Sequence, residues 1–286
     1  MRKFSLFFIF SIILAIALIF ARQKVSTLTN TNMDLENKSE FHYNFEETKI
    51  IDESSTLDQS KDESWWLTSG GIFTIKEGVG KTTQGSLPDD SKWRLAYLSS
   101  SPVDTDLGFH PQNIFRLLTK QKWQNFSQEI CLNIKSENLS ESPNRNQSNG
   151  IFLLNRYRDR DNLYYAGIRV DGAAVIKKKI NGVYQTIAYK KYFSQEDYNR
   201  DTNPNLLPKN TWIGIRSEVR NNPDASVKIN LYINNVRDSD NWNLILEVVD
   251  DGKSFGEKII SEEGYAGIRT DFMDVEFDNF QIKELK

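Results

Sequence analysis

The sequence predicts an all-β protein, a two-sheet antiparallel jelly-roll sandwich preceded by an N-terminal apolar helix and a disordered stalk. Two observations predict the sandwich. From Trp65 onward, short runs alternate apolar and polar residues with a period of two, as half-buried strands do. Glycine, asparagine, aspartate and proline separate these runs, for example at Asp171-Gly172 and Asn181-Gly182, and such residues favour the tight turns between antiparallel strands.

Residues 1–22 are predicted to be a signal peptide or a membrane anchor. Arg2 and Lys3 precede an apolar run over residues 4–21, which is the pattern of an export signal. The run is short for a membrane-spanning helix and long for a cleaved signal, and its end is a poor cleavage sequence, which favours an anchor. We therefore expect an extracellular or cell-surface protein that is secreted, or that contacts the membrane through residues 4–21 if the signal is uncleaved.

Residues 23–64 are predicted to form a disordered acidic linker. The stretch 28–64 contains ten acidic residues against three lysines, and it has too few large apolar residues to offset its ordering entropy. Residues 65–286 are balanced in charge and are predicted to form one domain, and this balance gives no reason to expect nucleic acid as a partner. Cys131, the single cysteine, is expected to pack as a small buried side chain.

Turn residues divide the domain over 65–286 into candidate strands. The segment 193–208 lacks alternation and is predicted to be a long loop with one helical turn. The candidate strands cover 71–76, 93–98, 114–118, 127–134, 149–157, 162–170, 173–180, 183–189, 211–219, 226–234, 242–249, 264–270 and 273–283.

The domain also carries a series of short motifs in a fixed order. They are Trp66 with Gly70-Gly71-Ile72-Phe73, the hairpin over 150–165, the strand 212–216 followed by 227–234, and the segment 264–268 followed by Phe277-Asp278-Asn279-Phe280. This order resembles the concanavalin A-like lectin and glucanase superfamily, specifically its laminin-G-like jelly rolls. The resemblance spans nearly all of 65–286 and implies a jelly-roll fold with a glycan or polysaccharide as partner.

The heptapeptide YAGIRVD at 165–171 returns as YAGIRTD at 265–271. In each copy the alanine and isoleucine are expected to face the core, while the tyrosine, glycine and arginine face outward, and the strand that begins at Trp212 divides in the same way. Rings that pack on sugars, guanidinium donors and glycines that leave depth suit a sugar-binding face, although ordinary outer strand faces also carry tyrosine and arginine. The predicted ligand-binding residues are Tyr165, Arg169, Trp212, Arg216, Tyr265 and Arg269.

No catalytic residue is predicted. Glycosidases of this superfamily carry paired acids on one strand, and the nearest run is Asp274, Glu276 and Asp278, which we interpret as alternate residues of an edge or closing strand. Residues 216–220 look like a strand of alginate lyases, but the Q-[IV]-H element of those enzymes is absent. A Ser-His-Asp triad would depend on His110, which we expect to be exposed, and the nucleophile-elbow pattern is absent.

The sequence therefore predicts an exported or surface-tethered, lectin-like carbohydrate-binding domain without an evident catalytic site. Two alternatives stay open: a glycoside hydrolase or polysaccharide lyase with an atypical site, and a protein-binding adhesion module. No motif requires a cofactor. The resemblance implies a structural calcium ion near the terminal strand, for which Asp278 is the matching position, although one aspartate supplies few of the roughly six to eight oxygen ligands that calcium takes.

Overall fold

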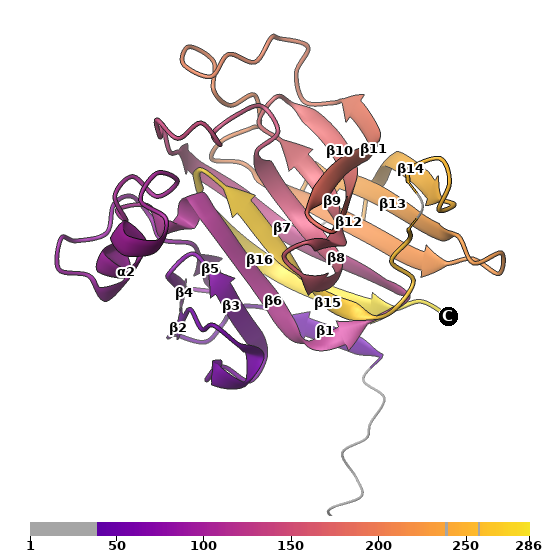
Figure 1. Cartoon of the computed structure of the whole chain (residues 1–286), viewed down its shortest axis with the longest axis horizontal. Helices are drawn as coiled ribbons and strands as arrows, with labels where there is room; N and C mark the ends of the chain where they lie inside the picture. Colours follow the sequence, from indigo (N-terminus) through magenta and orange to yellow (C-terminus); the bar gives the residue numbers. More distant parts are fainter. Residues whose placement is uncertain (1–38, 238–239, 257) are drawn as a thin grey trace, which may run out of the picture. The chain divides into compact units, whose positions relative to one another are not determined.

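The structure, a computed structural model, describes residues 39–237, 240–256 and 258–286. The predicted apolar helix over 1–22 and the first part of the predicted linker lie outside the described residues. Within the described part, no helix is long and apolar enough to cross a membrane. Residues from Glu40 to Lys286 form one compact unit, and the prediction of an antiparallel two-sheet sandwich is confirmed (Figure 1).

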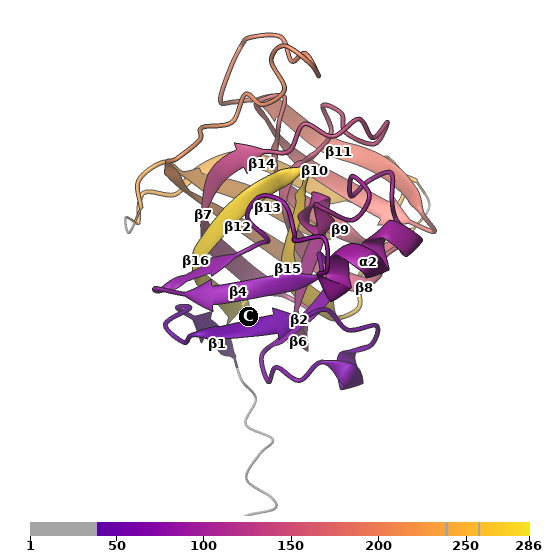
Figure 2. The same cartoon turned by 90° about the vertical axis from the view of Figure 1, so that its left-hand side faces the viewer.

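Sheet A is the larger sheet. It contains nine strands in the order β14-β13-β12-β7-β16-β5-β4-β2, with β1 paired to β16. The strands are β1 Glu40–Tyr43, β2 Lys49–Asp52, β4 Ile72–Lys76, β5 Val79–Lys81, β7 Phe126–Glu137, β12 Trp212–Asn221, β13 Val227–Asn234, β14 Asn243–Asp250 and β16 Met273–Glu284. Figure 2 shows the short strands β2 and β4 at the near end of this sheet.

Sheet B contains seven strands in the order β11-β10-β9-β8-β15-β6-β3. The strands are β3 Trp65–Ser69, β6 Ile114–Trp123, β8 Gly150–Asp159, β9 Asn162–Arg169, β10 Ala173–Ile180, β11 Val183–Lys191 and β15 Gly264–Asp271. Within the described ranges, the helical elements are α2 Lys92–Ser100 and two 3-10 turns, η1 Leu57–Gln59 and η2 Pro111–Asn113. Helix α2 lies at the left edge of the sandwich in Figure 1.

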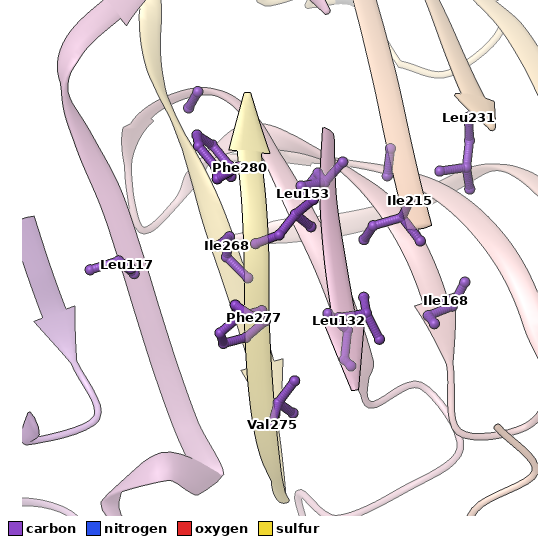
Figure 3. Packing of buried hydrophobic residues seen from close by; sticks show 14 of the residues in the cluster. Leu117, Leu132, Leu153, Ile168, Ile215, Leu231, Ile268, Val275, Phe277 and Phe280 are labelled. Carbon is purple, nitrogen blue, oxygen red and sulfur yellow. The ribbon is translucent and has the colours of Figure 1, made fainter. Parts of the chain in front are cut away.

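The main core lies between the two sheets. Alternate strand residues from both sheets meet there, including Ile168 and Ile268 from sheet B and Leu132, Ile215 and Phe277 from sheet A, all of them fully buried (Figure 3). Burial of each such side chain contributes about 1.5–3 kcal/mol relative to leaving it exposed. The predicted inward direction of the isoleucines in both heptapeptide copies is therefore confirmed.

The folded unit begins earlier than the acidic composition predicts. β1 pairs with β16 and β2 pairs with β4, so residues 40–52 belong to sheet A rather than to a disordered linker. Phe41, Tyr43 and Phe45 recur with a period of two, and their ring centres lie 5.5, 5.3 and 6.3 Å from that of Trp65. Composition averaged over the whole stretch hides this short aromatic strand.

Three other expectations need correction. Residues 93–98 form part of helix α2 instead of a strand, and only Tyr97 of that helix is buried. β16 lies inside sheet A between β7 and β5 rather than at an edge. Cys131 is only partly buried, on the outer side of sheet A, because Ile130 and Leu132 take the inward positions. The predicted loop over 193–208 is confirmed, without a helical turn.

The two copies of the heptapeptide lie in the same sheet. β9 and β15 both pair with β8, so they run parallel to each other on its two sides. The copies are staggered by two residues, because Gly167 and Arg269 both pair with Phe152 of β8. The outward residues of both copies therefore share one face.

The glycine of each copy lies against the backbone of a neighbouring strand. A Cβ atom on Gly167 would lie 2.1 Å from the carbonyl oxygen of Ile151, and one on Gly267 would lie 2.2 Å from that of Leu117. Each glycine is therefore needed because two strands approach closely at that point. The sequence pattern predicts a different role for these glycines, that of leaving depth in a sugar-binding face. The repeated heptapeptide is one structural device used in two strands.

Candidate functional site

A cleft of about 510 Å³ opens on the outer face of sheet B, the face turned away from the main core. Strands β6, β8, β9, β10, β11 and β15 contribute to it, together with a loop near residue 104 and a loop over residues 144–149 that we call the rim loop. The cleft is lined by Asp104, Ile114, Asn144, Asn146, Ser148, Asn149, Phe152, Tyr165, Lys177, Tyr184, Arg269 and Asp271.

Three aromatic rings form the apolar part of the cleft. The rings of Tyr165 and Tyr184 stack with their centres 6.1 Å apart, and Phe152 meets Tyr165 edge to face at 5.9 Å. Phe152 and Tyr165 are almost fully buried, whereas Tyr184 is 52% exposed. A firmly supported ring with one exposed side can pack against the apolar face of a sugar.

Arg269 crosses the cleft from β15 toward β9. Its Nε donates to Asp271 at 2.8 Å, and its Nη1 donates to the hydroxyl of Tyr165 at 3.1 Å. Burial opposes the charge of Arg269, but Asp271 and the two neighbouring tyrosines outweigh it and raise the pKa of the guanidinium. Among the described residues, Nη2 of Arg269 has no hydrogen-bond acceptor, so it remains available to a ligand.

Lys177 supplies a second positive charge without a counter-ion. Its ammonium lies 5.7 Å from the ring centre of Phe152, and it has no hydrogen bond or ion pair with any residue that the structure describes. Burial, reinforced by the charges of Arg169 and Arg269, lowers the pKa of Lys177 to about 8. Partial burial alone would raise the pKa of the Tyr184 phenol. The charges of Arg269 and Lys179 outweigh this effect and lower that pKa to about 8.

The rim loop is held in shape by its own polar groups. The main-chain N–H of Asn146 donates to the side chain of Asn149 at 2.6 Å, and that of Ser148 donates to the side chain of Asn146 at 2.8 Å. Asn144 donates to Asp104 at 2.9 Å, which joins the rim loop to the neighbouring loop. Such internal bonds reduce the entropy that a ligand must remove on binding.

Four of the six predicted ligand-binding residues lie on the outer face of sheet B. Tyr165 and Arg269 line the cleft, as described. Arg169 is 8% exposed, pairs with Asp171 at 2.8 Å and donates to the carbonyl of Gln147 at 3.0 Å, so it supports the rim loop from beneath. Tyr265 lies at the opposite end of β15 and lines a second hollow of about 610 Å³.

The other two predicted residues, Trp212 and Arg216, lie in β12 of sheet A. Arg216 pairs with Glu129 and stacks at 4.1 Å on the ring of Trp242, while Arg237 stacks at 4.4 Å on the ring of Trp212. They face outward from the other sheet, so the six residues do not share one surface. Alternation shows which residues of a strand face outward, but it does not show which sheet the strand joins.

Asp278 does not fit a calcium ion. Its carboxylate pairs with the guanidinium of Arg237 and accepts a hydrogen bond from the main-chain N–H of Asn279 at 2.8 Å. Across the described ranges, no group of three or more histidine, cysteine, aspartate or glutamate side chains is placed to hold a metal ion. The carboxylate that the resemblance assigns to calcium is engaged by a positive side chain instead.

The acids of β16 have separate partners. Asp274 accepts hydrogen bonds from the main-chain N–H of Gly85 at 2.7 Å and from Ser136 at 2.9 Å. Glu276 pairs with Lys81 at 3.3 Å. These acids belong to sheet A and do not line the cleft of sheet B.

Sequence reasoning missed Phe152, Lys177, Tyr184 and the rim loop. Lys177 alternates outward in the run 173–180, so its direction was predictable, but the strand order that places it beside β9 was not. Phe152 lies in a strand that is apolar on both faces and gives no alternation signal. The rim loop is rich in asparagine and serine. This composition is typical of loops in general, so it does not indicate a binding site.

No protein-family model matches the chain, and no curated protein matches it in sequence. Solved structures of similar fold include the carbohydrate binding module CBM66 from Bacillus subtilis, which is 14% identical over 77% of this chain and 95% of that chain, with a TM-score of 0.48. A prokaryotic β-1,3-1,4-glucanase from a mouse hindgut metagenome is 9% identical over 86% of this chain and all of that chain, with a TM-score of 0.45. The GH43 BlXynB protein from Bacillus licheniformis is 11% identical, with a TM-score of 0.47. The match covers 88% of this chain and 40% of that chain.

These structures are at most 14% identical to this chain, and their TM-scores all lie below 0.5. TM-scores below 0.5 carry no functional conclusion to this chain. What it binds must be argued from its own surface.

Proposed function

We propose that this chain is an exported or surface-tethered carbohydrate-binding domain that holds a glycan in the cleft on the outer face of sheet B. One observation carries the proposal: the exposed ring of Tyr184, the free nitrogen of Arg269 and the rim loop meet in one cleft of about 510 Å³. A sugar needs a flat apolar support and several directional hydrogen-bond partners, and these groups supply both.

The charge of the cleft favours a glycan that contains acidic sugars. Arg269 is neutralised by Asp271, but Lys177 has no counter-ion among the described residues. A partly buried ammonium is poorly solvated, so a carboxylate or sulfate on the ligand would restore a favourable environment for its charge. We therefore expect acidic glycans to bind more tightly than neutral ones.

The cleft supports binding better than cleavage of a glycosidic bond. That reaction needs two carboxyl groups that face the bond from fixed positions. Asp271 is tied to Arg269, and Asp104 accepts hydrogen bonds from Ser142 and Asn144. Both carboxylates of the cleft are therefore engaged in holding its walls.

The sequence of the N-terminal segment supports the export part of the proposal. The apolar run over 4–21 after Arg2 and Lys3 supports either secretion or attachment to a membrane. Mass spectrometry of the mature N-terminus distinguishes the two, because cleavage removes about the first 22 residues. Detection of the full chain in the cytoplasmic fraction alone contradicts export.

Two matched arginine variants test the location of the glycan site. Arg269 in sheet B and Arg216 in sheet A each pair with a carboxylate and lie against an aromatic ring. The full chain, kept in a non-glycoside detergent, is screened on a glycan array, and the affinity of each hit is measured by calorimetry. Arg269→Met is expected to weaken binding about tenfold or more, and Arg216→Met is expected to leave it unchanged.

Several outcomes contradict the proposal. Binding to no neutral or acidic glycan removes it. Loss of binding in Arg216→Met with retention in Arg269→Met moves the site to sheet A. Products that absorb at about 232 nm, or new reducing ends, from a panel of polysaccharides establish a lyase or a glycoside hydrolase instead.

A further inference from the structure

Ser86, His110 and Asp106 form a hydrogen-bonded chain outside the cleft. Ser86 Oγ lies 2.9 Å from His110 Nε2, and His110 Nδ1 lies 3.1 Å from Asp106 Oδ2. The ring of His110 is 22% exposed, in contrast to the exposed position expected from the sequence. The same three residue types, joined through the same atoms, link a nucleophile, a base and an orienting carboxylate in serine hydrolases.

The carboxylate determines which imidazole nitrogen carries the proton. Ionised Asp106 can only accept hydrogen bonds, so Nδ1 of His110 must donate to it. Nε2 of the neutral ring then has a free lone pair, which accepts the hydroxyl proton of Ser86. This is the tautomer that a general base for Ser86 requires.

Asp106 is held firmly in this position. Its Oδ1 accepts a hydrogen bond from Ser140 at 2.5 Å, and its Oδ2 accepts a second one from Asn113 at 3.3 Å. Asp106 and Leu107 have φ angles of 50° and 60°, a left-handed conformation that aspartate tolerates and that is unfavourable for leucine. Backbone strain such as that at Leu107 persists where the surroundings enforce it, and it is concentrated at functional sites.

Ser86 is presented so that a substrate can reach it. It is exposed and follows Gly85, whose φ is 68° and whose Cβ position has no atom within 4 Å. The main-chain N–H of Ser86 donates to no residue within the described ranges, so it is available to an oxyanion that forms at the attacked carbon. Among the residues that the structure describes, the side chain of Ser86 hydrogen-bonds only to His110.

We propose that Ser86, His110 and Asp106 form a catalytic site that hydrolyses small acyl esters. The hydroxyl oxygen of Ser86 bonds to the ester carbonyl carbon, and its proton passes to Nε2 of His110. The carbon–oxygen bond to the alcohol breaks, and the alcohol takes that proton. Water then attacks the acyl-serine, returns a proton through His110 and releases the carboxylic acid, which restores the serine hydroxyl.

The position of the site points to an ester carried on a glycan. Asp104 lines the cleft, and Ser140, which holds Asp106, lies just before the rim loop. An exposed serine also suits an acyl group on a long polymer better than a free molecule that needs an enclosing pocket. This substrate class, an O-acetylated polysaccharide, rests on the proposed function, whereas the ester hydrolysis does not.

The first test uses probes that contain no sugar. The full chain is treated with a fluorophosphonate, and the labelled peptide is identified by mass spectrometry; turnover of p-nitrophenyl acetate is measured in parallel. Label on Ser86 is expected, and Ser86→Ala is expected to lose about a thousandfold or more in kcat. Ser100→Ala is the matched control, because Ser100 is an exposed helical serine that donates only to the carbonyl of Ala96.

A second variant tests the role of Asp106 as a positioning residue. In Asp106→Asn the amide can donate to Nδ1 of His110, which moves the ring proton to Nε2 and removes the acceptor for Ser86. We expect kcat to fall while KM stays unchanged, whereas a general loss of structure would change both and lower the melting temperature. An unlabelled Ser86 in the folded chain, or full esterase activity in Ser86→Ala, overturns the proposal and leaves glycan binding untouched.

Discussion

The ion pair of Lys178 and Asp250 joins the two sheets inside the sandwich. Lys178 comes from β10 of sheet B and Asp250 from β14 of sheet A, with 2.8 Å between the ammonium and the carboxylate. Their side chains are 2% and 0% exposed. The hydroxyl of Tyr164 donates to Asp250 at 2.7 Å, and Lys178 also donates to the carbonyl of Lys258 at 2.8 Å. The pair is therefore buried with its polar groups satisfied.

Asp250→Asn preserves the shape of this side chain and removes its charge. The ammonium of Lys178 would then remain buried without a counter-ion, which costs about 3–5 kcal/mol of the free energy of unfolding. For a domain of this size each kcal/mol changes the melting temperature by roughly 2–4 °C, so we expect a decrease of about 6–20 °C. Urea denaturation followed by tryptophan fluorescence measures the free energy directly, and calorimetry measures the melting temperature.

Glu247→Gln on the same strand is the control. Glu247 pairs with Lys228 at the same distance of 2.8 Å, but the two side chains are 49% and 37% exposed. Exposed ion pairs contribute about 0–1 kcal/mol, so this variant is expected to change stability little. Equal losses in the two variants would refute the reasoning, because burial would then not determine what the pair contributes.

Three further predictions follow from the outer face of sheet B. Gly167→Ala is expected to lower the free energy of unfolding by about 1–3 kcal/mol or more, measured by urea denaturation, because its Cβ would lie 2.1 Å from the carbonyl oxygen of Ile151. Lys177→Met is expected to stabilise the unliganded protein by about 1–3 kcal/mol near pH 7, because burial lowers the pKa of Lys177 from its ordinary value of 10.5 to about 8. The gain should shrink as pH rises above about 8, since the folded protein then loses the buried charge. Difference absorbance should show one phenol ionising near pH 8, and Tyr184→Phe should remove that transition; its persistence contradicts the assignment.

The strands of this fold were largely predictable from alternation, because one face of most strands is buried and the other is not. The exceptions have specific causes. β8 is buried on both faces, so Phe152 gave no signal. The alternation of Trp93, Leu95 and Tyr97 predicts a strand over residues 93–98, whereas these residues form part of helix α2, in which only Tyr97 is buried.

The candidate site was less predictable than the fold, because it depends on which strands become neighbours. Tyr165 and Arg269 are 104 residues apart in sequence and meet because β9 and β15 both pair with β8. Trp212 and Arg216 have the same local pattern and lie on the other sheet. The serine of the proposed hydrolytic site was hidden for a related reason, since Ser86 meets His110 through loops with no regular period.

The pairing of β1 with β16 has a consequence for the order in which the chain can fold. The first strand of the described domain and the last twelve-residue strand are hydrogen-bonded to each other, and β16 also occupies the middle of sheet A between β7 and β5. During synthesis, the residues that precede Met273 cannot complete sheet A, because its central strand β16 has not yet been made. A chain truncated before β16 would lack the strand that joins β7 to β5 in sheet A. We therefore expect resistance to proteases to appear abruptly when β16 becomes free to insert.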